Sequence, residues 1–435
     1  MKPLHLVWFL GGYQSRGWLD PRWGAGYDFR KADLYMDSAR VLERGCFDGI
    51  LFADQQSIDD TYTGSLGASL RSGYESICGD PLVLLAMMGA VTKRIGLAAT
   101  LSTTFHPPFL LARQINALDH LIEGRVGWNV VTSARVRDGE NYGKPLPPHD
   151  LRYDMADEYL ELVHALWRSW DTDAVLLDRE NGIFADPSKV RELNFEGKWY
   201  SCRGPLPFCA SPQVSPVIFQ AGGSGRGREF AAQHAEAILS NQNSTRGMKE
   251  FVADIRQRAQ KYDRQPRILF SIQPVLGDTP AAARENEKAL FSLATTPAYF
   301  EGGLARASTS LGIDLAKLEL DTPVKDQLHK VNRGDKGESI LFQYFKARPD
   351  TTPREMGVTE AIKITLPIVG TAEQVADRLC EIVDETDADG FLIREAFLPS
   401  YIADIVDRLV PALQRRGRMR TEYAGKTFRE HLNEY

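Results

Sequence analysis

The chain has 435 residues, of which 43% are apolar and 25% are charged, and its formal net charge is −6. This composition is typical of a globular protein with a large core, and it excludes a mostly disordered chain. The mild negative charge offers no basic surface to nucleic acid or to a membrane, so a small-molecule partner is expected. The length fits one elaborated domain or two plain ones, and an α/β barrel reaches it through insertions.

Cysteines and the N-terminal run indicate the compartment. The five cysteines are odd in number, and their wide spacing matches neither a zinc site nor a redox dithiol: Cys46, Cys78, Cys202, Cys209 and Cys380. Reduced thiols and no metal site are therefore expected. The run MKPLHLVWFL lacks a small-residue cleavage site and fits a β-strand better than a signal peptide. The longest apolar run, PLVLLAMMGAV, has 11 residues and is too short to span a membrane. These features predict a cytoplasmic protein.

Short apolar runs alternate with helix-length amphipathic stretches along most of the chain, which indicates a parallel sheet covered by helices. The predicted strands are Leu4–Leu10, Gly49–Ala53, Ile95–Leu101, Val126–Thr132, Val217–Gln220, Ala237–Ser240, Ile268–Val275 and Gly390–Arg394. The predicted helices are Lys31–Arg44, Pro81–Lys93, Pro107–Ile122, Asp150–Trp170, Gly225–His234, Thr245–Lys261, Thr371–Glu385 and Tyr401–Gln414. Eight strand–helix units predict an α/β fold of the (β/α)₈, or TIM, barrel type.

The strand–helix units are not evenly spaced along the chain. The longer intervals indicate four insertions, at about residues 54–79, 134–149, 171–215 and 277–370. Most of them follow predicted strands, and the loops after barrel strands gather on the face that carries active sites. We therefore expect one elaborated barrel domain over residues 1–435, in which the first and last insertions are candidate lids. The basic segment RRGRMR follows the last predicted helix and is expected to begin a solvated extension over about residues 415–435.

The stretch VIFQAGGSGRGREF is predicted to be a strand, a glycine-rich turn and a helix start. Such a helix directs bare N–H groups outward, and Gly223 and Gly225 let an anion approach the backbone. Ser224 supplies a hydroxyl and Arg226 or Arg228 a charged fork for the same anion. The sequence therefore predicts a phosphate site. A tight turn that needs glycine for its dihedral angles is the alternative.

Two sharper motifs do not match this turn. A nucleophile elbow has the pattern Gly-x-Ser-x-Gly, but Gly222-Gly223-Ser224-Gly225 is followed by Arg226, which disfavours a serine hydrolase. A dinucleotide fingerprint has another glycine spacing and lies in the first βαβ unit, whereas this turn lies halfway along the chain. A phosphate-handling lyase or isomerase would need a lysine or paired carboxylates at strand ends, where amides and hydroxyls predominate.

Polar residues at predicted strand ends form a second group of candidates. Asn129 interrupts the apolar strand in EGRVGWNVVTS, and its amide can exchange two hydrogen bonds with the edge of a heterocycle, although it could also simply tie down a loop. Asp54 and Thr100 occupy comparable positions at the second and third strands. His149 and Tyr153 share one face of the predicted helix in HDLRYDMADEYLELVHALW, where they either hold an anion or pack together.

His106, in TFHPP after the third strand, is a candidate to orient substrate or exchange a proton. With Asn129 it makes up the predicted catalytic pair. Aromatic residues near strand ends predict a planar or apolar ligand, with core packing as the alternative for each: Trp8, Phe9, Tyr13, Phe105 and Trp128.

Three stretches, DHLIEGRVGWNVVTS, HDLRYDMADEYLELVHALW and VIFQAGGSGRGREFAAQHAEAIL, closely resemble the bacterial-luciferase-like flavin monooxygenases. Within these, they resemble the nitrilotriacetate, pristinamycin and dibenzothiophene-sulfone monooxygenase subfamily, over nearly the whole chain. The resemblance implies a barrel that takes reduced FMN from a separate NAD(P)H-dependent flavin reductase and uses O₂ to oxidise a small organic substrate. Substrates accepted in the subfamily are aminopolycarboxylates, sulfones and N-heterocycles, including flavin-type rings.

The resemblance also implies FMN contacts at Asp54, Thr100, Asn129, His149, Tyr153 and Ser224, of which the last three would hold the phosphate. It further implies a homodimer or homotetramer. Two other functions stay open: a deazaflavin-dependent oxidoreductase that transfers hydride without O₂, and a flavin-binding barrel without turnover.

Overall fold

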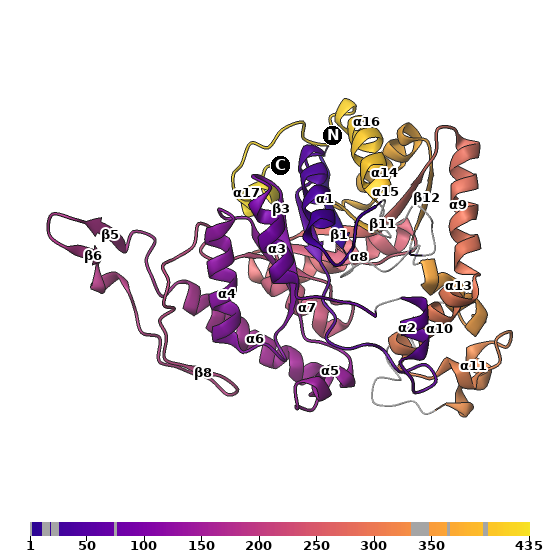
Figure 1. Ribbon diagram of the computed structural model, residues 1–435, viewed down its shortest axis with the longest axis horizontal. Helices are drawn as coiled ribbons and strands as arrows, with labels where there is room; N and C mark the ends of the chain where they lie inside the picture. The colour runs from indigo at the N-terminus through magenta and orange to yellow at the C-terminus, as the bar shows by residue number, and fades with distance from the viewer. Residues whose placement is uncertain are drawn as a thin grey trace.

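Eight parallel strands close into a ring, and helices cover its outer surface (Figure 1). The computed structural model describes residues 2–10, 18, 26–73, 76–331, 348–362, 366–394 and 399–435. In order around the ring, the strands are β1 (His5–Leu10), β2 (Gly49–Phe52), β3 (Gly96–Ser102), β4 (Val126–Val131), β9 (Val217–Gln220), β10 (Ala237–Ser240), β11 (Arg267–Leu276) and β13 (Gly390–Arg394). Parallel pairing of β13 with β1 completes the closure. The predicted (β/α)₈ barrel and its eight strands are confirmed.

The outer helices also follow the prediction. They are α1 (Ala32–Arg44), α3 (Pro81–Ala90), α4 (Pro108–Leu121), α6 (His149–Trp167), α7 (Gly225–His234), α8 (Thr245–Ala259) and α14 (Ala372–Thr386). The last predicted helix is interrupted: α15 (Pro399–Asp404) passes through a π-helical turn, Ile405–Leu409, into α16 (Val410–Arg415). None of the helices in the described part of the chain combines the length and the apolar character needed to cross a bilayer.

Strand alternation separates the barrel interior from the layer under the helices. On β1, Trp8 packs among helix-layer residues, 5.9 Å from the Phe47 ring, whereas Val7 belongs to the interior cluster. On β4, Trp128 is fully buried in the helix layer and donates from Nε1 to the carbonyl of Leu101 at 3.1 Å. The hypothesis that Trp8 and Trp128 form pocket walls is therefore wrong, because the two-residue period turns both of them away from the interior.

A C-terminal helix, α17 (Phe428–Leu432), closes the amino-terminal end of the barrel. Phe428 is fully buried against three glycines at the starts of β2, β3 and β4. A Cβ atom at Gly49, Gly96 or Gly127 would lie only 2.5, 2.3 or 2.9 Å from the Phe428 ring. Because glycine has no side chain, these three positions leave the space that the Phe428 ring fills.

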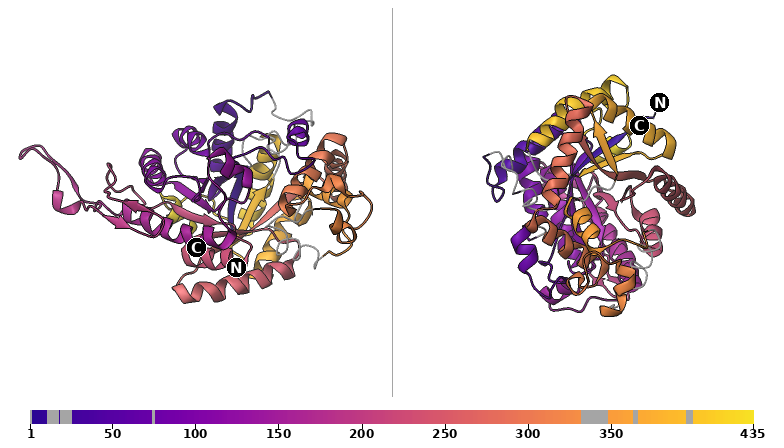
Figure 2. Two further views of the ribbon diagram at one scale, coloured as in Figure 1. Left: turned by 90° about the horizontal axis from the view of Figure 1, so that it is seen from below. Right: turned by 90° about the vertical axis from the view of Figure 1, so that its right-hand side faces the viewer.

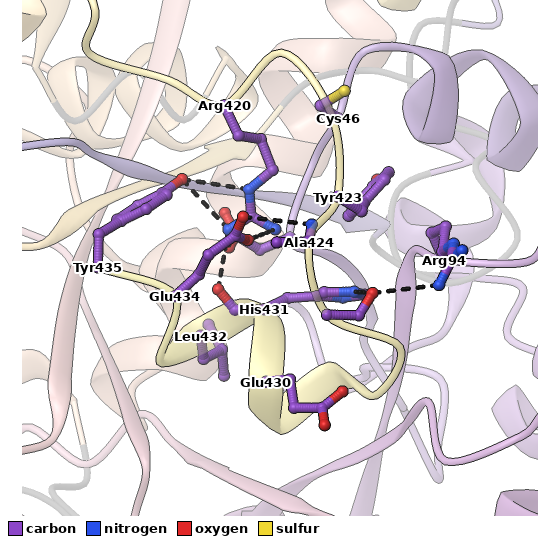
Figure 3. A network of polar contacts seen from close by, with 12 residues as sticks. Cys46, Arg94, Arg420, Tyr423, Ala424, Glu430, His431, Leu432, Glu434 and Tyr435 are labelled. Carbon is purple, nitrogen blue, oxygen red and sulfur yellow. Dashed lines mark hydrogen bonds and ion pairs between the residues drawn. The ribbon is translucent and has the colours of Figure 1, made fainter.

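Charged groups anchor this C-terminal segment beneath the barrel (Figure 3). Arg420 donates to Asp48 Oδ1 at 2.7 Å and to the carbonyl of His431 at 2.8 Å, and Asp48 also accepts from the amide of Leu6. The expectation of a solvated extension is wrong, since Arg418 and Arg420 are both buried. Docking of α17 draws the basic segment under the barrel, where Asp48 and other carboxylates pair with its charges.

The insertions add further elements around this core. The segment after α6 forms two hairpins, β5 (Val175–Asp178) with β6 (Ile183–Ala185) and β7 (Phe195–Glu196) with β8 (Ser201–Cys202), of which the first projects far from the barrel (Figure 2). The last insertion contains α9 (Pro280–Ala294), α10 (Pro297–Leu311), α11 (Val324–Gln327) and α13 (Pro353–Ile362), and β12 (Pro367–Gly370) pairs with the end of β11. Helix α10 packs on α13 and on α2 (Gly67–Ser72), which joins the first and last insertions.

We expect Phe428→Ala to lower the free energy of unfolding by about 3–5 kcal/mol, because it removes a buried ring and leaves a cavity among three glycines. Urea denaturation followed by circular dichroism measures the effect. Phe291→Ala is the control, since Phe291 lies half-exposed on α9 and its removal should cost less than about 0.5 kcal/mol. Equal losses for the two variants would show that α17 does not support the barrel.

Candidate functional site

A cavity of about 290 Å³ lies at the carboxyl ends of β2, β3, β4 and β9. It is lined by Asp54, Gln55, Gln56, Thr100, Ser102, Val131, Thr132, Ser133, Ala134, Arg135, Asp138, Tyr153, Gln220, Ala221 and Gly222. These four strands are neighbours in the ring, so side chains that are far apart in the sequence meet at one mouth. This is the end of the barrel at which active sites are found.

An amide and a hydroxyl meet on adjacent strands, where Thr100 lines the cavity and Asn129 does not. Asn129 Nδ2 donates to Thr100 Oγ1 at 3.0 Å, and both side chains are more than nine-tenths buried. The Oδ1 atom of Asn129 is also buried and has no hydrogen-bond partner among the described residues. A buried acceptor without a donor costs free energy, so this atom is suited to receive an N–H from a bound ring. Two strand-end candidates, Thr100 and Asn129, are thus in contact with each other, and their role as cofactor contacts stays a prediction.

Asp54 follows β2 and lines the same cavity. Its carboxylate accepts from the amide of Gln55 at 2.8 Å and from the side chain of Gln56. Burial raises the pKa of Asp54, whereas these hydrogen bonds and the nearby His106 act in the opposite direction. The predicted candidates Asp54 and His106 are therefore electrostatic neighbours, although His106 does not line the cavity and its Nδ1 lies 3.0 Å from the carbonyl of Ser102.

The glycine-rich turn adjoins the cavity through Gly222, whereas Ser224 is not among the lining residues. Ser224 caps α7, and its Oγ accepts from the amide of Gly227 at 3.0 Å. Within the described part of the chain, the amides of residues 223–226 have no acceptor. A Cβ atom built on Gly223 or Gly225 would meet nothing within 4 Å, so there is space beside these amides. Bare amides at a helix start, next to open space, are suited to an anion, so the phosphate site stays a prediction.

Tyr153 links this turn to the cavity. Its hydroxyl lies against the first turn of α7, where a Cβ atom on Gly227 would be 2.7 Å from it. Burial raises the pKa of Tyr153, and hydrogen bonding with Gln220 and Thr132 opposes that effect. His149 lies on the same helix face, with its ring 5.2 Å from that of Tyr153, as predicted. The His149 side chain is half-exposed, and its Nδ1 lies 2.6 Å from Asp150.

The side chain of Arg226, which the sequence predicted as an anion ligand, forms ion pairs within the protein instead. Its guanidinium pairs with Asp154 at 3.0 Å and with Asp157, both on α6. Asp157 also lies 2.7 Å from Nε2 of His234, at the far end of α7. Arg226 therefore fastens α7 to α6. In this arrangement its charged group is paired with two carboxylates, while its backbone amide has no acceptor among the described residues.

Several lining residues did not emerge from the sequence. Gln220 is a buried polar residue at the end of the apolar run VIFQ, and its position at a strand end was the signal that could have identified it. The hydroxyl of Ser102, at the end of β3, lies 2.7 Å from that of Ser133, in the loop after β4. Arg135 and Asp138 come from the second insertion, and no sequence pattern marked them as site residues.

Two other aromatic candidates, Phe9 and Phe105, lie outside the cavity lining. Phe105 is buried and stacks on Tyr142, with ring centroids 4.9 Å apart. Phe9 is covered by the guanidinium of Arg394, 4.6 Å from its centroid. Tyr13 lies outside the described residues. Over the described ranges, no three His, Cys, Asp or Glu side chains are grouped to hold a metal ion.

Comparison with known proteins identifies the family. The Luciferase-like monooxygenase family matches residues 21–419. The chain belongs to this family. It is 40% identical over 416 residues to dibenzothiophene-sulfone monooxygenase of Rhodococcus erythropolis, which covers 94% of this chain and 91% of that protein. It is 33% identical to nitrilotriacetate monooxygenase component A of Aminobacter aminovorans, over 99% of this chain and 95% of the relative.

A solved structure supports the same conclusion. The crystal structure of a riboflavin lyase with modified FMN and its substrate riboflavin superimposes with a TM-score of 0.87 at 30% identity, covering 100% of this chain and 96% of that one. The chain is thus a luciferase-like flavin monooxygenase, a family that uses reduced flavin and O₂.

The Asp157 contacts generate a stability prediction. Burial raises the pKa of Asp157, but hydrogen bonds from His234 and Arg226 outweigh burial and hold the pKa below its usual value. A lowered folded-state pKa stabilises the fold above the unfolded value, near pH 4, and the contribution disappears as the pH falls through the folded value. We expect Asp157→Asn to cost about 1–2 kcal/mol at pH 7, since hydrogen bonds to a charged group are lost. Denaturation midpoints of the two proteins should converge in acid.

Asp154→Asn is the matched control. Asp154 pairs with the same arginine but is more than half-exposed, so its loss should cost less than about 1 kcal/mol. If Asp154→Asn destabilised as much as Asp157→Asn, the link between α6 and α7 through Asp157 would be contradicted.

Proposed function

We propose that this protein is the oxygenase component of a two-component system, and that it uses FMNH₂ from a separate NAD(P)H-dependent flavin reductase, with O₂, to oxidise a small organic substrate in the cytoplasm. The observation that carries the proposal is the cavity itself. Its lining residue Thr100 is bonded to Asn129, whose amide oxygen has no partner among the described residues, and its lining residue Gly222 leads into the open amides at the start of α7. A phosphorylated heterocycle needs a hydrogen-bond acceptor for its ring at one end of the site and free amides for its phosphate at the other.

The donor set fits a flavin mononucleotide. Asn129 Oδ1 would receive a ring N–H, with Thr100 holding the amide in orientation and Asp54 close by. The amides of residues 223–226, the Ser224 hydroxyl and Tyr153 would hold the phosphate, with His149 at its outer side. The FMN in the related riboflavin lyase structure supports this cofactor. The name component A for the nitrilotriacetate relative supports a separate partner.

When bound, reduced flavin supplies the electrons that activate O₂, so the protein needs no metal or nucleophile of its own. The residues of this chain place the ring, orient the substrate and exclude water. Asn129 orients the ring edge, and His106, beside Asp54, is positioned to hold or move a proton at its imidazole near the cavity.

Two insertions wall the cavity against water. Ser57 donates to Asp138 Oδ1 at 2.5 Å, and Asn141 donates to the carbonyl of Gln56 at 2.7 Å, which joins the loop after β2 to α5 (Val136–Asn141). The last insertion holds the same loop farther along, where Asp314 accepts from the amide of Thr63 at 2.9 Å. These contacts support the proposal that the loop after β2 is the lid of the site, held by the segment that follows α10.

The substrate is a small organic molecule that enters beside the ring site; aminopolycarboxylates, sulfones and N-heterocycles, including flavin-type rings, are the classes proposed. Deazaflavin-dependent oxidoreductases share the fold at low identity, 14% for a secondary alcohol dehydrogenase. The identities of 33–40% to monooxygenases favour the FMN-dependent reaction over that alternative and over a barrel without turnover.

Ser224→Ala and Tyr153→Phe should each weaken FMN binding by about 1–2 kcal/mol, because each removes a hydrogen bond to a charged group. Fluorescence titration measures the affinity. Riboflavin lacks the phosphate, so binding of riboflavin as a ligand should change little in either variant. Undiminished FMN affinity in both variants would remove the phosphate assignment, and equal losses for both ligands would show that the variants disturb the site as a whole.

The function itself is tested by titrating the protein with FMNH₂ without oxygen and then adding a pulse of O₂. We expect saturable binding of FMNH₂, followed by a transient absorbance change before oxidised flavin appears. Stopped-flow absorbance records both steps. Tight binding followed by oxidation at the rate of free flavin would indicate sequestration, and an absence of binding would contradict the proposed function.

A further inference from the structure

The half of the barrel mouth formed by β10, β11, β13 and β1 lies across the ring from the cavity, and it carries a charged residue. Arg394 is the last residue of β13 and is partly buried. Strand alternation gives its direction. Leu392 belongs to the interior cluster, so Arg394, two residues farther along the strand, points to the same side. A guanidinium is therefore held on the interior side of the barrel, where the strands end.

Two neutral side chains orient this guanidinium. Its central carbon lies 4.6 Å from the centroid of the Phe9 ring on β1, and its Nη1 donates to Oδ1 of Asn241, just after β10, at 3.2 Å. Phe9 is the direct partner of Arg394 in the pairing of β1 with β13, and its ring packs against the interior cluster. Because a phenyl ring and an amide carry no net charge, these two contacts orient the guanidinium without neutralising it.

The cavity and Arg394 share one end of the barrel. Thr100, which lines the cavity, lies two residues after Ala98 of the interior cluster, so it points inward as Arg394 does. Arg394 is not among the lining residues, because its strand belongs to the other half of the ring. A flavin held at β2, β3, β4 and β9 would leave the half around β13 to the substrate, which must meet the flavin ring to be oxidised.

The side chains of this second half favour one kind of substrate. Earlier along its strands, the interior side chains are apolar, with Leu239 on β10, Leu269 on β11 and Leu392 on β13. An arginine presents its N–H donors in a planar fork that matches a carboxylate. An apolar interior with one oriented cation at its end therefore suits an organic molecule that has an apolar body and a carboxylate.

We propose that Arg394 determines the substrate class of this protein, and that the substrate is an organic carboxylate whose anionic group pairs with the Arg394 guanidinium. Phe9 and Asn241 orient that guanidinium and act as positioning residues. This inference rests on the proposed function, and it narrows the small organic substrate to a molecule with a negative charge.

Three planar probes of nearly the same shape test the inference: benzoate is anionic, benzamide neutral and benzamidine cationic. Each is titrated into the protein loaded with oxidised FMN, and the visible absorbance of the bound flavin reports binding beside it. We expect the wild-type chain to bind benzoate about tenfold or more tightly than benzamide, because a charge-assisted hydrogen bond is gained. Arg394→Met should abolish this preference, and Arg394→Glu should reverse it in favour of benzamidine.

The affinity for FMN is measured in the same variants. Arg394→Met should keep the wild-type affinity, and Arg378→Met, which removes a half-exposed arginine on α14, should keep both the FMN affinity and the preference for benzoate. Equal losses of FMN and benzoate binding in Arg394→Met would place Arg394 in the cofactor site and overturn the inference.

Two further results would contradict the assignment of Arg394. The first is a wild-type chain that binds FMN but does not prefer benzoate to benzamide, and the second is a preference that survives Arg394→Met. A wild-type chain that bound no FMN would contradict the proposed function, and the inference with it, so the two failures are distinguishable.

Discussion

Closure of eight parallel strands into one ring is the constraint on which the rest of this protein depends. Because every strand runs in the same direction, the carboxyl ends of β2, β3, β4 and β9 meet at a single mouth. No barrel strand then has an unpaired edge, and the loops at the mouth are free to vary without loss of the backbone hydrogen bonds. The cavity exists because the ring is closed.

The other end of the ring must also be filled. Phe428 occupies the space left by three glycines, and Arg420 with Asp48 holds the C-terminal segment beneath it. A buried pair of this kind is costly to break once its partner is removed. Sealing one end with an aromatic ring leaves the opposite end as the open face, so the C-terminal segment helps to decide where a ligand can enter.

The site itself depends on groups that are held without partners. Among the described residues, Asn129 keeps one buried oxygen unpaired and the amides at the start of α7 have no acceptor, while Arg226 is occupied by Asp154 and Asp157. Such groups favour a ligand because binding satisfies them, whereas a fully paired site would gain little. The contacts between α6 and α7 keep the start of α7 in place before any ligand arrives, and the Thr100 hydroxyl holds Asn129.

By itself, the sequence determined the barrel, since apolar runs of strand length alternating with amphipathic helices have few other solutions. It also located the turn at Ser224 and the polar strand ends at Thr100 and Asn129, because alternation and glycine spacing are local properties. Only the tertiary structure decided that Trp128 packs outward, that Arg226 pairs with α6, and that the basic C-terminal segment is buried. These outcomes depend on which distant groups come into contact, and the one-dimensional pattern does not encode those contacts.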